Sequence, residues 1–101
     1  MKHASYLSDI TPGEILLEEF IKPHGLSQNG LAAALGVSPM TVNQIVNGKR
    51  SVTAEVALRL GRYFGMSPQF WLHLQARYDL EKAEDAIGPR LRREVNPMVA
   101  A

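Results

Sequence analysis

The chain has 101 residues, a formal net charge of +1 and no cysteine. This length corresponds to one domain with a modest core, and the absence of cysteine excludes a disulfide framework and a thiolate metal site. No apolar stretch approaches the ~18 residues of a membrane span, and the first residues contain no apolar region typical of a signal peptide. We therefore expect a cytoplasmic protein without a membrane partner.

The first predicted helix begins at a capping box. Residues 11–14, Thr-Pro-Gly-Glu, place threonine at the N-cap, proline at the first helical position and glutamate three residues after the cap. Leu16 and Phe20 lie four residues apart and form its apolar face. We expect the helix to end near Lys22, before the next proline, and residues 1–10 to form an N-terminal arm.

Residues 27–50 predict two short helices joined by a tight turn. Ser27 is a suitable N-cap for the first helix, and Gly36 follows its last apolar residue, where a left-handed residue often ends a helix. Ser38 and the proline after it begin the second helix, which we expect to extend over about 39–47. Because polar residues remain exposed on the second helix, the pair is typical of a motif that places one helix in the DNA major groove.

Two further helices are predicted after this motif. Thr53 is expected to cap the fourth helix, and Gly65 to end it. The fifth and longest helix covers about 68–86 and is predicted to stop at Gly88-Pro89. The remaining residues, 89–101, are expected to form a basic tail.

The predicted fold is therefore all-α, with five helices over residues 11–88 and a longer C-terminal helix. The periodic apolar positions of these helices indicate one small core. The predicted core residues are Leu16, Phe20, Leu31, Leu35, Val42, Ile45, either Leu58 or Leu60, Phe64 and Trp71.

Charge is distributed unevenly along the chain. No Asp or Glu lies between Lys22 and Ala54, whereas acids gather at residues 14–19 and 79–85. A protein that approaches phosphates is expected to keep carboxylates away from the docking face. The gap therefore favours a nucleic-acid partner for the helix pair.

The helix pair resembles the helix-turn-helix family related to phage repressors (XRE type). Counting from Gln28, the residues Ala32, Gly36, Val42 and Ile45 fall where that family has small, turn and apolar residues. This resemblance implies a lambda-repressor-like helical bundle.

The wider chain resembles HigA-type antitoxins of bacterial toxin–antitoxin pairs. The resemblance extends over roughly residues 10–95, and its most specific segment is Ser67-Pro-Gln-Phe-Trp-Leu-His-Leu-Gln. It implies a homodimer that binds a palindromic operator, autorepresses its own operon and neutralises a partner toxin by complex formation. The implied toxin is a HigB-like ribonuclease that cleaves messenger RNA.

The candidate DNA contacts are exposed residues on and around the second motif helix. Gln44 can form a bidentate pair with adenine, and Met40 or the Thr41 methyl group can pack on a thymine methyl group. The basic residues that follow the helix are expected to hold phosphates, which position the protein without specifying sequence. A solvated surface role remains the alternative for each polar residue, and the cap role alone could explain Ser38. The full candidate set is Gln28, Ser38, Met40, Thr41, Asn43, Gln44, Asn47, Lys49 and Arg50.

The fifth helix carries a candidate dimer interface. A single small helix-turn-helix unit binds weakly, so proteins of this class usually dimerise to contact two half-sites. Trp71, Leu74 and Tyr78 form an apolar stripe, which we predict to contribute to this interface, although such a stripe is also typical of ordinary core. Candidate toxin-binding surfaces are the exposed acids of the first helix or of residues 79–85, on charge complementarity.

Nothing in the sequence favours an enzyme. His3, His24 and His73 lack the spacing of a metal site, and there is no phosphate-binding glycine loop or nucleophile motif. We therefore predict no catalysis and no cofactor. Two alternatives stay open, a stand-alone transcriptional regulator without a toxin and a protein-interaction module that has kept only the fold.

Overall fold

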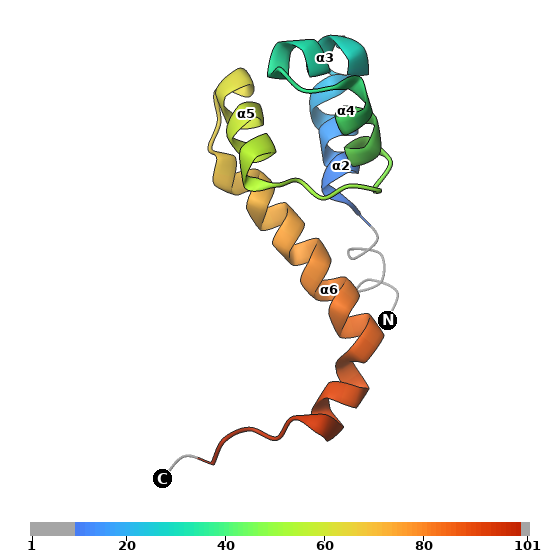
Figure 1. Cartoon of the computed structure of the whole chain (residues 1–101), viewed down its shortest axis with the longest axis vertical. Helices are drawn as coiled ribbons and strands as arrows, with labels where there is room; N and C mark the ends of the chain where they lie inside the picture. Colours follow the sequence, from blue (N-terminus) through green and yellow to red (C-terminus); the bar gives the residue numbers. More distant parts are fainter. Residues whose placement is uncertain (1–9, 100–101) are drawn as a thin grey trace.

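The computed structural model describes residues 10–99, and all regular structure in this range is helical (Figure 1). The predicted N-terminal arm and His3 lie outside the described residues, apart from Ile10. The elements are α2 (Pro12–Ile15), the π-helix η1 (Leu16–Ile21), α3 (Gln28–Leu35), α4 (Pro39–Val46), α5 (Ala54–Phe64) and α6 (Pro68–Glu94). The all-α prediction is confirmed.

The start of α2 is held in two ways. The predicted capping box is present, because Thr11 Oγ1 accepts from the Glu14 N–H over 3.1 Å and Glu14 Oε1 accepts from the Thr11 N–H over 3.0 Å. Gly13 then packs directly on the end of α4, where an added Cβ would lie 1.8 Å from the carbonyl oxygen of Ile45. Only a residue without a side chain allows the two helices to cross this closely.

The first helix has the predicted extent but a different winding. After α2 the chain widens into η1, and the Lys22 N–H donates to the Leu17 carbonyl oxygen five residues back, over 3.0 Å. This is the hydrogen-bond step of a π-helix. Leu16 and Ile21, five residues apart, are both buried as a result. The predicted helix is therefore present, with its second part wound as a π-helix.

The predicted turn between two short helices is confirmed. Ser27 Oγ caps α3 by accepting from the Gly30 N–H over 2.9 Å, and Gly36 ends α3 in the left-handed region with φ of +74°. Ser38 Oγ caps α4 by accepting from the Thr41 N–H over 3.2 Å. Ser27 and Ser38 thus each accept from an N–H group in the first turn of a helix, where the helix itself offers no backbone acceptor.

The core confirms most of the predicted residues. Leu58 is 61% exposed, so Leu60 is the core residue of the two alternatives. Phe20 and Phe64 are only partly buried, but their rings pack at 5.0 Å between centroids. The predicted residues that are buried are Leu16, Leu31, Leu35, Val42, Ile45, Leu60 and Trp71.

The last helix is longer than predicted. α6 passes through Gly88 and Pro89 and ends at Glu94, so the expected stop at Gly88-Pro89 was wrong and the first part of the predicted tail is helical. Proline removes one backbone hydrogen bond and crowds the preceding turn, which bends a helix without always ending it. An ion pair between Arg92 and Glu84 (3.0 Å) bridges the proline. Figure 1 shows α6 leaving the globular part and changing direction in its last turns.

Candidate DNA interface

α4 divides its side chains between the core and the surface. Val42, Ile45 and Val46 are buried against the bundle, which leaves the opposite face of the helix outward. Met40 on that outward face is 62% exposed, and Asn43 is exposed beside it. The outward face is therefore free to meet a partner along the whole of α4.

A chain of amide hydrogen bonds links α4 to the start of α3. Asn47 Nδ2 donates to Asn43 Oδ1 over 3.2 Å, and Asn43 Nδ2 donates to Gln28 Oε1 over 3.3 Å. The three candidate residues, which come from two helices, therefore form one exposed polar surface. The contacts also leave the Gln28 NH₂ group available as a donor.

The loop after α4 folds back onto the helix. Gly48 adopts φ of +75°, and the Lys49 N–H donates to the Gln44 carbonyl oxygen over 2.8 Å. Beyond this turn Arg50 Nε donates to the side-chain oxygen of Gln44 over 2.9 Å. The structure thus joins a predicted base-contacting residue to a predicted phosphate-contacting residue.

The same loop is anchored on α6 by a residue that the sequence analysis missed. Gln75 is 9% exposed, and its Oε1 accepts from the Val52 N–H over 2.8 Å. Gln75 Nε2 in turn donates to Asp79 Oδ1 over 3.0 Å. The available signal was a polar residue four positions after Trp71, on the side of the helix that faces the core.

Two further contacts stabilise the turn between α3 and α4. Ser38 Oγ, besides its cap role, is hydrogen-bonded to Thr41 Oγ1 at 3.0 Å. Arg59 Nη1 donates to the last carbonyl oxygen of α3, at Leu35, over 2.9 Å, and Arg59 is also paired with Glu55 at 3.1 Å. The role of Arg59 was not predicted, because its partner lies on another helix.

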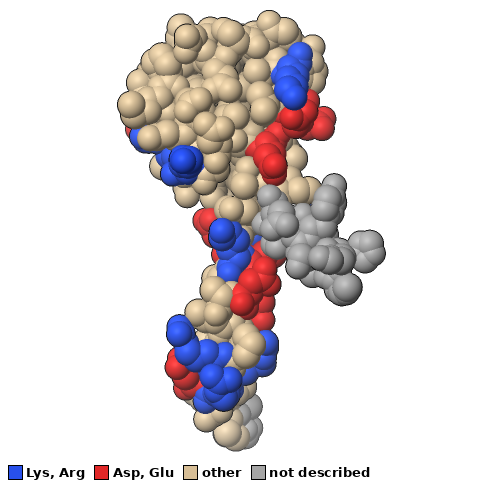
Figure 2. All heavy atoms as spheres, turned by 90° about the vertical axis from the view of Figure 1, so that its right-hand side faces the viewer, with Lys and Arg blue, Asp and Glu red and all other residues tan. Residues whose placement is uncertain are grey.

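The charges of the described residues leave the α4 surface free of acids. The exposed carboxylate nearest in sequence is Glu55 on α5, which pairs with Arg59 at 3.1 Å, and the acids before α4 belong to α2 and η1, where Glu18 pairs with Lys22 at 2.9 Å. Figure 2 shows a globular part with few charges on the side viewed, above an α6 that carries mixed positive and negative side chains. Across residues 10–99 there is no group of three or more potential metal ligands, and no helix in that range could span a bilayer.

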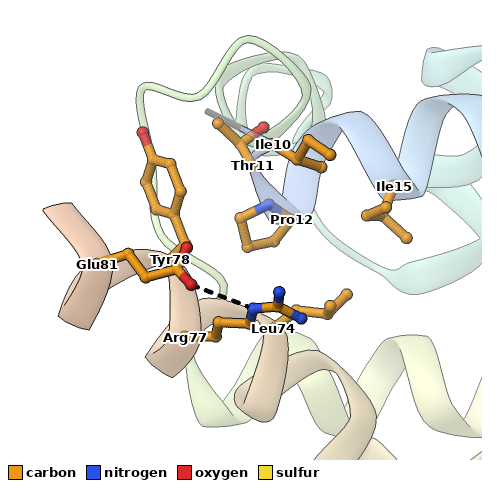
Figure 3. Close-up of a pocket in the computed structure, with 8 residues that line it drawn as sticks. All are labelled: Ile10, Thr11, Pro12, Ile15, Leu74, Arg77, Tyr78 and Glu81. Atoms are coloured by element: carbon orange, nitrogen blue, oxygen red, sulfur yellow. Dashed lines mark hydrogen bonds and ion pairs between the residues drawn. The ribbon is translucent and has the colours of Figure 1, made fainter. Parts of the chain in front are cut away.

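One of the three residues predicted for the dimer interface, Trp71, does not lie at the surface. Trp71 is completely buried within its own chain, so it belongs to the core and offers no surface to a second copy. Leu74 and Tyr78 are partly buried and line a cavity of about 140 Å³ between α6 and the start of α2 (Figure 3). The Arg77–Glu81 ion pair (3.4 Å) lies beside it.

The capped helix pair and its exposed polar face define a helix-turn-helix protein, and the helix-turn-helix family model matches residues 17–71. Virulence-associated protein I of Dichelobacter nodosus is 57% identical over 75 residues, which are 74% of this chain and 69% of that protein. Antitoxin HigA-1 of Vibrio cholerae is 41% identical over 71 residues, or 70% and 67% of the two chains.

A solved structure of the Pseudomonas aeruginosa antitoxin HigA with the higBA promoter has a TM-score of 0.86 and 47% identity. The match covers 89% of this chain and 98% of that one. The chain belongs to the HigA-type antitoxins of the helix-turn-helix family.

Proposed function

We propose that the protein is a DNA-binding antitoxin that binds a palindromic operator as a dimer and represses its own operon. The observation that carries this proposal is the exposed face of α4, whose amide side chains are ordered by bonds to Gln28 and Arg50. The similar HigA of Pseudomonas aeruginosa was solved with the higBA promoter, which supports DNA as the partner of this face.

Six of the proposed contacts fall into two groups. Met40, Thr41 and Gln44 lie on the exposed or half-exposed side of α4 and are assigned to base edges. Gln28 at the start of α3 and the basic residues after α4 are assigned to phosphates. The complete proposed set is Gln28, Ser38, Met40, Thr41, Asn43, Gln44, Asn47, Lys49 and Arg50.

The dimer is proposed to form through α6, by the predicted Leu74 and Tyr78 and by the part of the helix outside the globular core. Leu80 is 71% exposed and Leu91 is 40% exposed, and Ile87 lies between them at a spacing that puts all three on one helix face. Such a row of apolar side chains is suited to a second copy of the same helix. Two copies would present two α4 helices to half-sites about one helical turn of DNA apart.

The second part of the proposal is neutralisation of a partner toxin by complex formation, the toxin being a HigB-like ribonuclease that cleaves messenger RNA. Its support is membership of the HigA family. The exposed acids of α2 and η1, and those of residues 79–85, remain the candidate surfaces for a basic toxin. We propose no catalytic role for the chain itself, and the cytoplasm, where operon DNA and messenger RNA are found, as its place of action.

Fluorescence anisotropy tests DNA recognition. The purified protein is titrated onto labelled DNA from upstream of its own coding sequence and onto a shuffled duplex, each at two salt concentrations. We expect tighter binding to the upstream DNA and an affinity that falls with salt, because phosphate contacts release counterions. Equal affinity for both duplexes would contradict operator recognition.

Co-expression tests the antitoxin role separately. The product of the neighbouring reading frame is expressed with and without this chain, and growth and co-purification are measured. The proposal predicts growth arrest by the neighbour alone, rescue by this chain and a stable complex. Rescue without a complex would contradict neutralisation by binding, and selective DNA binding without any toxin would favour a stand-alone regulator.

A further inference from the structure

The contact between Gln44 and Arg50 determines how the Gln44 amide is oriented. Arg50 Nε donates to Gln44 Oε1 over 2.9 Å. Since the guanidinium group has donors and no acceptor, its partner must be the oxygen of the amide and cannot be the nitrogen. The Gln44 oxygen therefore faces Arg50, and the Gln44 NH₂ group is left to point elsewhere.

The main chain supports this contact from both sides. Before Arg50, the Lys49 N–H is bonded to the Gln44 carbonyl oxygen at 2.8 Å. After Arg50, the buried Val52 donates its N–H to Gln75 on α6 at 2.8 Å. Arg50 thus sits in a short loop that is tied to α4 at one end and to α6 at the other. Little conformational freedom has to be lost for it to hold Gln44 when DNA binds.

We propose that Arg50 is a positioning residue for base recognition, and that it makes Gln44 favour guanine or thymine over adenine. Pairing with adenine N6 and N7 uses both the oxygen and the nitrogen of a glutamine amide. Arg50 takes one of the two lone pairs of the Gln44 oxygen and holds that oxygen toward the loop, so the NH₂ donors are the part of the amide that is left unengaged. Guanine N7 and O6 and thymine O4 are acceptors. The proposal rests on the proposed function, because it requires α4 to enter the major groove.

The competing role for Arg50 is a phosphate contact and nothing more. A phosphate contact contributes to the affinity for every sequence and carries no base preference of its own. The two roles therefore differ in one observable quantity, which is the base preference at the single operator position that Gln44 contacts.

The test is selection of bound duplexes from a library with randomised central positions, by the wild type, Gln44→Ala and Arg50→Lys. Lysine keeps the positive charge but replaces the rigid planar fork with a flexible ammonium group. We expect the position that loses its preference in Gln44→Ala to favour guanine or thymine in the wild type. In Arg50→Lys that preference should fall roughly tenfold, the scale of one good base contact, while the salt dependence stays close to that of the wild type.

Two controls separate positioning from affinity and from folding. Lys49→Ala removes the neighbouring basic side chain, which takes no part in the bond to the Gln44 side chain. It should weaken binding to all duplexes and lower the salt slope by about 1, with base preferences unchanged. In a Gln44→Ala background, Arg50→Lys should alter no base preference, and the fluorescence of the single buried Trp71 should report the same unfolding midpoint for all variants.

A selection profile for Arg50→Lys identical to that of the wild type would overturn the positioning role, as would a wild-type preference for adenine at the Gln44 position. Either result would leave operator binding intact. If the wild type showed no base preference at any position, the proposed DNA recognition would fail together with this inference.

Discussion

At the scale of single residues, the contacts that follow from local sequence were predictable and those between distant residues were not. Thr11, Ser27 and Ser38 all cap helices as expected, because a cap depends on residues three positions apart. Gly13 shows the opposite case. Its role is to let α2 touch the Ile45 carbonyl group, and nothing near it in sequence indicates that approach.

Gly13→Ala is expected to destabilise the fold although alanine is the better helix former. The added methyl group would overlap the main chain of α4, and overpacking of this kind costs about 1–3 kcal/mol or more. Urea unfolding followed by Trp71 fluorescence measures the effect. Gly30→Ala is the matched control: its new Cβ would meet the Ser27 Oγ that caps α3, at 2.9 Å, and not the main chain, so a weakened cap (about 1 kcal/mol) is offset by the helix propensity of alanine (about 1 kcal/mol). Equal stability of Gly13→Ala and the wild type would show that α2 and α4 are not in close contact.

At the scale of elements, the ends of the helix-turn-helix pair were predictable from the sequence, whereas the winding of η1 and the end of α6 were not. The helix-turn-helix pair was predicted correctly, because serine caps and a terminal glycine define it within a few residues. The π-helical turns of η1 and the passage of α6 through Pro89 were not. The first accompanies the burial of Leu16 and Ile21, five residues apart, and local apolar spacing gives no reason for the second.

The same limit applies to the candidate site. Its exposed residues followed from their positions around α4, but the bonds that order them join residues 28 to 43, 44 to 50 and 52 to 75. Periodicity does not predict contacts between separate elements. It also could not separate Leu58 from Leu60, or assign Trp71 to the core and not to an interface.

Gln75→Leu is expected to loosen the loop that follows α4. Leucine is similar in size but leaves the buried Val52 N–H without its acceptor, which costs about 1–3 kcal/mol. Hydrogen exchange at the Val52 amide should accelerate, and urea unfolding should show the loss of stability. Gln69→Leu, at an exposed position of the same helix, is expected to change neither measurement. Unchanged protection of Val52 in Gln75→Leu would mean that α6 does not anchor this loop.

At the scale of the whole molecule, α6 gives the chain two parts with different roles. Its first turns pack on the bundle through Trp71, whereas the part from Leu80 onward extends from the globular part with Leu80 and Leu91 exposed. A helix that exposes apolar side chains along one face gains stability from a partner. We therefore propose that two copies pair through the outer part of α6, and that the resulting dimer presents two α4 helices to DNA.

Leu80→Glu is expected to shift the dimer to monomer, because a charge would be introduced into the proposed apolar interface. Sedimentation velocity at micromolar concentration measures the change. Leu58→Glu is the matched control, since Leu58 is similarly exposed (61% against 71%) but lies on α5. If the wild type itself sedimented as a monomer, or if Leu80→Glu remained dimeric, the α6 interface would be wrong.

The outward face of α4 and the loop after it are proposed to contact DNA. This is tested most directly by titrating isotope-labelled protein with its upstream DNA and following the amide chemical shifts. We expect the largest changes at the start of α3, along α4 and at residues 47–52, with small changes along the charged second half of α6. Changes concentrated on α6 or on the cavity beside Leu74, with α4 unaffected, would show that α4 is not the DNA-binding face.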